Sequence, residues 1–199
     1  MYVARDPTSR QSVVLPLLAL DDQTSVFLGR PCYHRSGEKR PVNCTSSLWT
    51  GARYSEAVVV SMTQGVAVLV EQAGAKNVTL IGYSGGGVLA LLVAQRVPSI
   101  STVVTLGANL DIHAWTQHHR LLPLTGSINP SDIVRWRSDL RQIHYIGGRD
   151  RRVPPETRTA FVERVPQATF ITLPELDHYC CWQDRWLEIL KSLDGISDS

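Results

Sequence analysis

Residues 77–95 read NVTLIGYSGGGVLALLVAQ, and this stretch decides the fold of the chain. The branched, apolar run Asn77–Ile81 is typical of a buried strand, and the almost wholly apolar run Gly87–Gln95 is typical of a helix buried beside a sheet. Between them, residues 82–86 (GYSGG) fit the pattern Gly-x-Ser-x-Gly. A serine in a sharp strand-to-helix turn needs close neighbours without side chains, which explains the glycines. The stretch predicts a strand, a tight turn that presents Ser84, and a helix.

The rest of the chain repeats this alternation of strand and helix. Helical spacing of apolar residues predicts a helix that begins near Tyr54 or Ser55 and ends at Gly74. Alternating strands and helices indicate parallel strands joined by right-handed crossovers. The predicted fold class is therefore α/β: a three-layer sandwich whose mostly parallel central sheet has about five to six strands, in one domain over residues 1–199. The further predicted strands are Ser25–Leu28, Thr102–Leu106, Gln142–Ile146 and Thr169–Leu173.

Ser84 is the candidate nucleophile, because the turn lifts its hydroxyl above the sheet. The helix that follows directs free N–H groups toward that point, and the N–H of Gly85 is the candidate oxyanion donor. The motif alone is weak, and its strength comes from the strand before it and the helix after it. A phosphate-binding turn is the alternative, but the chain lacks the Lys-Ser/Thr of a P-loop and the Gly-x-Gly-x-x-Gly spacing.

A serine hydroxyl needs a base to take its proton and an acid to orient that base. Asp150 follows the strand Gln142–Ile146 and is the candidate acid. His178 follows the strand Thr169–Leu173 and is the candidate base. The order serine, acid, histidine is typical of α/β-hydrolases. A turn or helix-capping role is the alternative for Asp150, and Asp111 and Asp177 compete with it as the acid.

The other histidines and the cysteines have further interpretations. His144 lies inside a predicted strand, which favours a packed core residue. A zinc site at His113, His118 and His119 lacks carboxylates or thiols at supporting spacing, so no metal and no cofactor are predicted. Four cysteines permit disulfides, and Cys32 and Cys44 are the easiest pair to bridge. The alternative is that both are buried free thiols. Thiol redox chemistry at Cys180 and Cys181 is disfavoured because the Cys-x-x-Cys spacing is absent; burial, or a bridge to a distant cysteine, is the alternative there.

Composition excludes several partners. The formal net charge is +2 and the basic residues are scattered, so nucleic acid is not an expected partner. The longest apolar stretch, Val58–Val70, is broken by polar residues and is shorter than the roughly 20 residues of a membrane span. No signal peptide is recognised at the start of the chain. Location therefore depends on residues upstream: cell envelope or secreted if a signal precedes this chain, otherwise cytoplasmic.

At these residues the sequence resembles the α/β-hydrolase family from Ser25 to His178. Beyond Ser84, Asp150 and His178, it resembles a bacterial subgroup of hydrolases often described as lipoproteins. The residues that carry this second resemblance are residues 28–32 (LGRPC), Trp49-Thr50 with Arg53-Tyr54, residues 109–111 (NLD) with Trp115, and residues 178–182 (HYCCW).

The resemblance implies a serine hydrolase that acts on small-molecule esters through an acyl-enzyme. The family has further strands before the one matched by Ser25–Leu28, and one of them precedes the loop with the second oxyanion donor. We therefore expect an N-terminally shortened form of the fold. The alternative is a catalytically weak binding protein with an incomplete oxyanion hole. The acyl group, the leaving group and the oligomeric state are not determined by the sequence.

Overall fold

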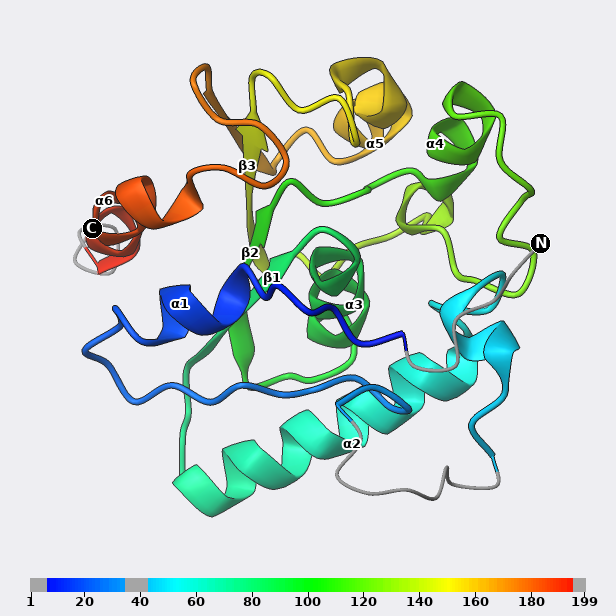
Figure 1. The fold of residues 1–199 in the computed structure, drawn as a ribbon. Coiled ribbons are helices and arrows are strands. Elements are labelled where there is room, and N and C mark those ends of the chain that lie inside the picture. Colours follow the sequence, from blue (N-terminus) through cyan, green and yellow to red (C-terminus); the bar gives the residue numbers. More distant parts are fainter. Residues whose placement is uncertain (1–6, 35–42, 195–199) are drawn as a thin grey trace.

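The computed structural model describes residues 7–34 and 43–194, and its centre is a four-stranded sheet (Figure 1). All strand pairs are parallel, and the strand order is β1-β2-β3-β4. The strands are β1 (Val78–Tyr83), β2 (Ile100–Leu106), β3 (Arg141–Gly147) and β4 (Thr169–Leu173).

The fold class predicted from sequence is confirmed, with a smaller sheet than expected. Four of the five predicted strands form, each within two residues of its expected start. Ser25–Leu28 is a loop in the structure, so the prediction of a strand there is wrong. Within the described residues β1 has β2 as its only strand partner, and Ser25–Leu28 does not pair with its open edge; Leu28 packs instead against the apolar core beside α2. Val26 is 64% exposed, which shows that branched residues alone do not make a strand without a neighbour to bond.

The helices before β1 and after the turn at Ser84 follow the sequence prediction closely. Helix α2 (Glu56–Ala73) begins after Ser55 and ends at Gly74, whose φ of 60° is the left-handed cap that glycine adopts without strain. Helix α3 (Gly85–Ala94) begins directly after Ser84 and is buried along most of its length. Its apolar surface on all sides fits a helix enclosed between the sheet and α2.

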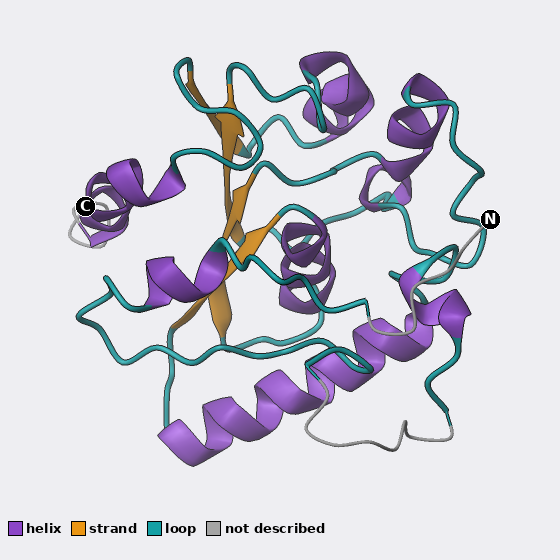
Figure 2. Ribbon diagram, viewed as in Figure 1, coloured by secondary structure: helices purple, strands orange, loops and turns teal. Residues whose placement is uncertain are grey.

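Helices cover both faces of the sheet, which gives the three layers (Figures 1 and 2). On one face, α2 and α3 pack with Phe161 and Trp136 in a large apolar core. On the other face, Leu17 packs with Trp182 and Trp186 against β2 and β3. The remaining elements are α1 (Val14–Leu18), η1 (Ser46–Trp49), α4 (Ile112–His118), η2 (Pro130–Asp132), η3 (Pro155–Arg158), α5 (Thr159–Arg164) and α6 (Trp182–Asp194).

The cysteines lie in the connections. Cys32 is joined to Cys44 by a disulfide with a Cα–Cα distance of 5.5 Å. This is the pairing that the sequence had left open against free thiols; residues 35–42 of the same connection lie outside the described part. Cys180 is joined to its neighbour Cys181, so neither cysteine is bridged to a distant one. In the described part of the chain no helix is long and apolar enough to cross a membrane.

Candidate active site

Ser84 occupies a sharp turn between β1 and α3. Its φ of 50° and ψ of −122° lie outside the regions that residues with a side chain prefer. The turn is tight, because a Cβ on Gly82 would lie 2.5 Å from the carbonyl oxygen of Gly86. The N–H of Ser84 donates to the carbonyl of Leu106 at 2.9 Å. The hydrogen-bond ladder between β1 and β2 therefore extends as far as Ser84 itself. A strained serine held this way is the geometry expected of a nucleophile elbow.

The start of α3 offers backbone donors beside the Ser84 hydroxyl. The carbonyl of Ser84 accepts the N–H groups of Gly87 and Val88. The N–H of Gly85 lies in the first turn, where a helix has no internal acceptor to offer it. Tyr54 packs over this residue, since a Cβ on Gly85 would lie 2.7 Å from the tyrosine hydroxyl. A side chain at position 85 would therefore have to displace the Tyr54 hydroxyl.

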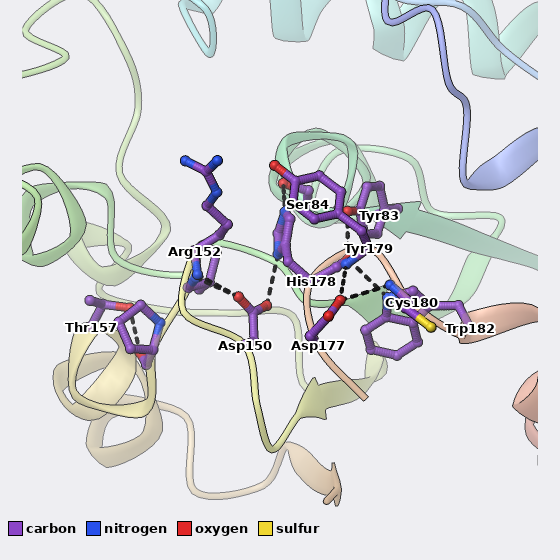
Figure 3. Close-up of polar contacts among 12 residues, drawn as sticks. Tyr83, Ser84, Asp150, Arg152, Thr157, Asp177, His178, Tyr179, Cys180 and Trp182 are labelled. Carbon is purple, nitrogen blue, oxygen red and sulfur yellow. Dashed lines mark hydrogen bonds and ion pairs between the residues drawn. The ribbon is translucent and has the colours of Figure 1, made fainter. Parts of the chain in front are cut away.

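The structure brings Ser84, His178 and Asp150 together at the carboxyl edge of the sheet (Figure 3). Nε2 of His178 lies 3.0 Å from Oγ of Ser84, and Nδ1 of His178 lies 2.7 Å from Oδ2 of Asp150. The side chains of His178 and Asp150 are 9% and 1% exposed. We call these three residues the Ser84–His178–Asp150 array. Its members come from three separate loops, which meet because parallel strands end at one edge.

Asp150 is held and charged by its surroundings. Its other oxygen, Oδ1, accepts the N–H groups of Arg152 at 2.7 Å and Val153 at 2.8 Å. Burial raises the pKa of Asp150, but the hydrogen bonds from His178, Val153 and Arg152 together outweigh it, and the pKa lies below its usual value. The carboxylate is therefore ionised at neutral pH. An ionised acceptor at Nδ1 places the histidine hydrogen on Nδ1 and leaves Nε2 free to accept one.

Three residues to which the sequence analysis gave no role in the site also contribute to it. The hydroxyl of Tyr83 and the indole N–H of Trp182 donate to the carbonyl of His178 at 2.6 and 3.1 Å. Burial raises the pKa of Tyr83, so its hydroxyl remains a donor. Gly107 has a φ of 55°, and a Cβ there would lie 3.2 Å from Oδ2 of Asp150. Gly107 directly follows β2, and a glycine at the carboxyl end of a strand could have been recognised in the sequence as part of the site. The contacts of Tyr83 and Trp182 depend on tertiary packing, so no sequence pattern indicated them.

The two competing acids have other partners. Asp111 caps α4, where its Oδ1 accepts the N–H groups of His113 and Ala114. Asp177 accepts the N–H groups of Tyr179 and Cys180, which shapes the loop that carries His178. Both carboxylates therefore bind backbone amides, and Asp150 is the one in contact with the histidine.

His113, His118, His119 and His144 have different polar partners, although the ring centroids of His118 and His119 lie 4.8 Å apart. His144 is 1% exposed and its Nδ1 lies 2.8 Å from Oγ1 of Thr105, as a packed core residue should. His113 lies 3.8 Å from Asp132, and His118 lies 3.5 Å from Glu156. His119 instead approaches the carbonyl oxygen of Arg152 at 2.9 Å.

When the chain is compared with known proteins, it is similar to solved structures of other proteins. No protein-family model matches the chain, and no curated protein matches it. An α/β-hydrolase enzyme from a sediment metagenome of the Mar Chica lagoon has 21% identity and a TM-score of 0.52, over 69% of this chain and 68% of that one. An esterase of Pyrococcus furiosus has 19% identity and a TM-score of 0.56, over 81% and 66%. A puromycin-hydrolysing peptidase of Mycobacterium tuberculosis has 15% identity and a TM-score of 0.55, over 67% and 24%.

These likenesses define the class of the protein by its fold. The chain has the α/β-hydrolase fold, with Ser84 at the turn after β1, as the sequence resemblance implied. The matched region spans about two thirds of the first two structures and 24% of the peptidase, so their activities are properties of longer chains.

Proposed function

We propose that this protein is a serine hydrolase that cleaves carboxylic esters through an acyl-enzyme on Ser84. The observation that carries the proposal is the unbroken chain of short contacts from Oγ of Ser84 through the imidazole of His178 to the Asp150 carboxylate. The esterases among proteins of similar structure support an ester substrate, and the peptidase supports the wider class of acyl transfer.

In the first step, Nε2 of His178 takes the Ser84 proton while Oγ attacks the ester carbonyl carbon. The imidazolium that forms is stabilised by the ionised Asp150, which also keeps the ring in the required orientation. The charge that develops on the carbonyl oxygen is stabilised by the N–H of Gly85 and the positive end of the α3 dipole.

In the second step, the tetrahedral intermediate collapses and the C–O bond to the leaving alcohol breaks. Nε2 of His178 returns its proton to that oxygen, so the alcohol departs neutral and the acyl group stays on Ser84. Water then repeats the sequence: His178 accepts its proton, the acid is released and the serine hydroxyl is restored.

The test is hydrolysis of short-chain 4-nitrophenyl esters by the wild-type chain, Ser84→Ala and His178→Ala. The proposal expects turnover by the wild type and its loss in both variants. Ser101→Ala is a matched control, because this serine lies in β2 away from the elbow. Wild-type turnover that survives in Ser84→Ala would reject the assignment. Absence of turnover in the wild type would favour the alternative of a binding protein that keeps the scaffold without the chemistry.

A further inference from the structure

The backbone of Arg152 is fixed at three points beside the Ser84–His178–Asp150 array. Its N–H donates to Oδ1 of Asp150 at 2.7 Å. Its carbonyl accepts the indole N–H of Trp115 at 2.6 Å and lies 2.9 Å from Nε2 of His119. A carbonyl can only accept, so Nε2 of His119 carries the hydrogen in this contact. The position of Arg152 is therefore tied both to the array and to α4.

The side chain of Arg152, by contrast, is exposed. Its guanidinium carbon lies 5.9 Å from the centre of the Tyr179 ring, and that ring packs edge-on against the imidazole of His178 with centroids 5.1 Å apart. Figure 3 shows the Arg152 side chain running from Asp150 toward the side on which Ser84 lies. Tyr179 is 62% exposed, so the cation and the ring are both accessible to solvent beside His178.

This positive charge has no carboxylate partner in residues 7–34 and 43–194. Two acidic groups near this part of the chain have other contacts: Glu156 lies 3.5 Å from Nδ1 of His118, and Asp177 accepts backbone N–H groups. A guanidinium that is unpaired at its tip can form a charge-assisted hydrogen bond with an anion, and the entropy lost in ordering its exposed side chain offsets part of that gain.

The position of the charge indicates which part of a substrate it meets. His178 returns its proton to the leaving oxygen, so the leaving group must lie next to Nε2 of His178. The Tyr179 ring packs against this histidine, and the Arg152 guanidinium lies over the Tyr179 ring. We propose that Arg152, together with the Tyr179 ring, selects esters whose leaving alcohol carries an ionised carboxylate. This inference rests on the proposed function, since it assumes that Ser84 and His178 perform the acyl transfer.

The experiment compares two aryl acetates that differ in charge on the leaving group: 4-acetoxybenzoate, which is anionic, and 4-acetoxybenzamide, which is neutral and of similar size. The quantity compared between variants is the ratio of the two kcat/KM values. The difference in intrinsic reactivity of the two esters is the same in every variant, so it cancels in that comparison. Arg152→Gln should lower this ratio about two- to fivefold, the upper part of the range for one exposed ion pair. Arg152→Lys should recover part of the loss, because it restores the charge without the planar fork.

Arg151→Gln is the matched control, because Arg151 is an exposed neighbour with the same charge. It should leave the ratio at the wild-type value. If both esters are hydrolysed in a Ser84-dependent way and Arg152→Gln leaves the ratio unchanged, or Arg151→Gln lowers it equally, the inference is overturned while the proposed function stands. If neither ester is hydrolysed in a Ser84-dependent way, the proposed function fails and the inference falls with it.

Discussion

Lowering the pH should destabilise this fold through one buried histidine, His144. The ring stacks on Phe170 with centroids 5.0 Å apart and meets the edge of Phe161 at 5.4 Å. Nδ1 contacts the Thr105 hydroxyl, and the side chain is almost fully enclosed. Burial lowers the pKa of His144 from 6.5 to about 3. The folded protein therefore keeps this histidine neutral at pH values where the unfolded chain protonates it.

The sign and size follow from proton linkage. Between pH 6.5 and about 3 the unfolded state binds the extra proton, so the free energy of unfolding falls as the pH falls. Stability from this group is complete above pH 6.5. Each pH unit inside the window costs about 1.4 kcal/mol, so moving from pH 7 to pH 5 should cost about 2 kcal/mol through His144 alone.

The assay is urea unfolding of the wild type and His144→Gln at pH 7 and pH 5. Glutamine keeps a polar group near Thr105 but loses the ring contacts with Phe161 and Phe170, so the variant should be less stable at pH 7. Because glutamine does not titrate, the stability that the variant loses between the two pH values should be about 2 kcal/mol smaller than in the wild type. His113→Gln, at an exposed position on α4, should keep the wild-type loss. An equal loss in the wild type and His144→Gln would refute the reasoning.

Two further predictions concern the acid and the first disulfide. Asp150→Asn should lower kcat by roughly 10⁴, as in other triads that lose the correct histidine tautomer, while Asp177→Asn stays near the wild type; the reverse order in steady-state ester kinetics would identify the wrong acid. Replacing Cys32 and Cys44 with serine should lower the free energy of unfolding by about 3 kcal/mol, because the closed loop no longer restricts the unfolded chain. Urea midpoints under non-reducing conditions measure this, and an unchanged midpoint would speak against the bridge.

The contacts of Ser84, Asp150 and His178 follow from where each residue stands in the sequence. Each comes shortly after a strand, and parallel strands have their carboxyl ends at the same edge of the sheet. Residues in these positions therefore converge, and this does not depend on how the helices pack. The choice of Asp150 over Asp111 could not be made this way, because Asp111 also follows a strand. It depends on the side chain of Asp111 turning back to cap α4, which is a local contact.

Other parts of the molecule depend on packing partners that are distant in sequence. Ser25–Leu28 has the composition of a strand, but it pairs with neither open edge of the described sheet, and Leu28 packs against the apolar core instead. Helix α6 was not predicted. It covers one face of the sheet, and its Trp182 and Trp186 are buried there. The bonds from Tyr83 and Trp182 to the His178 carbonyl likewise exist only once β1 and α6 are in place.

The central claim is that Ser84 is a nucleophile activated by His178. A fluorophosphonate probe tests it most directly, because it reacts with an activated serine whatever the natural substrate is. Mass spectrometry of the intact chain and of its peptides should show one adduct, on Ser84. The adduct should be absent in Ser84→Ala and strongly slowed in His178→Ala, while the control Ser101→Ala is labelled like the wild type. A folded wild-type chain that stays unlabelled, or an adduct on another residue that persists in Ser84→Ala, would contradict the account.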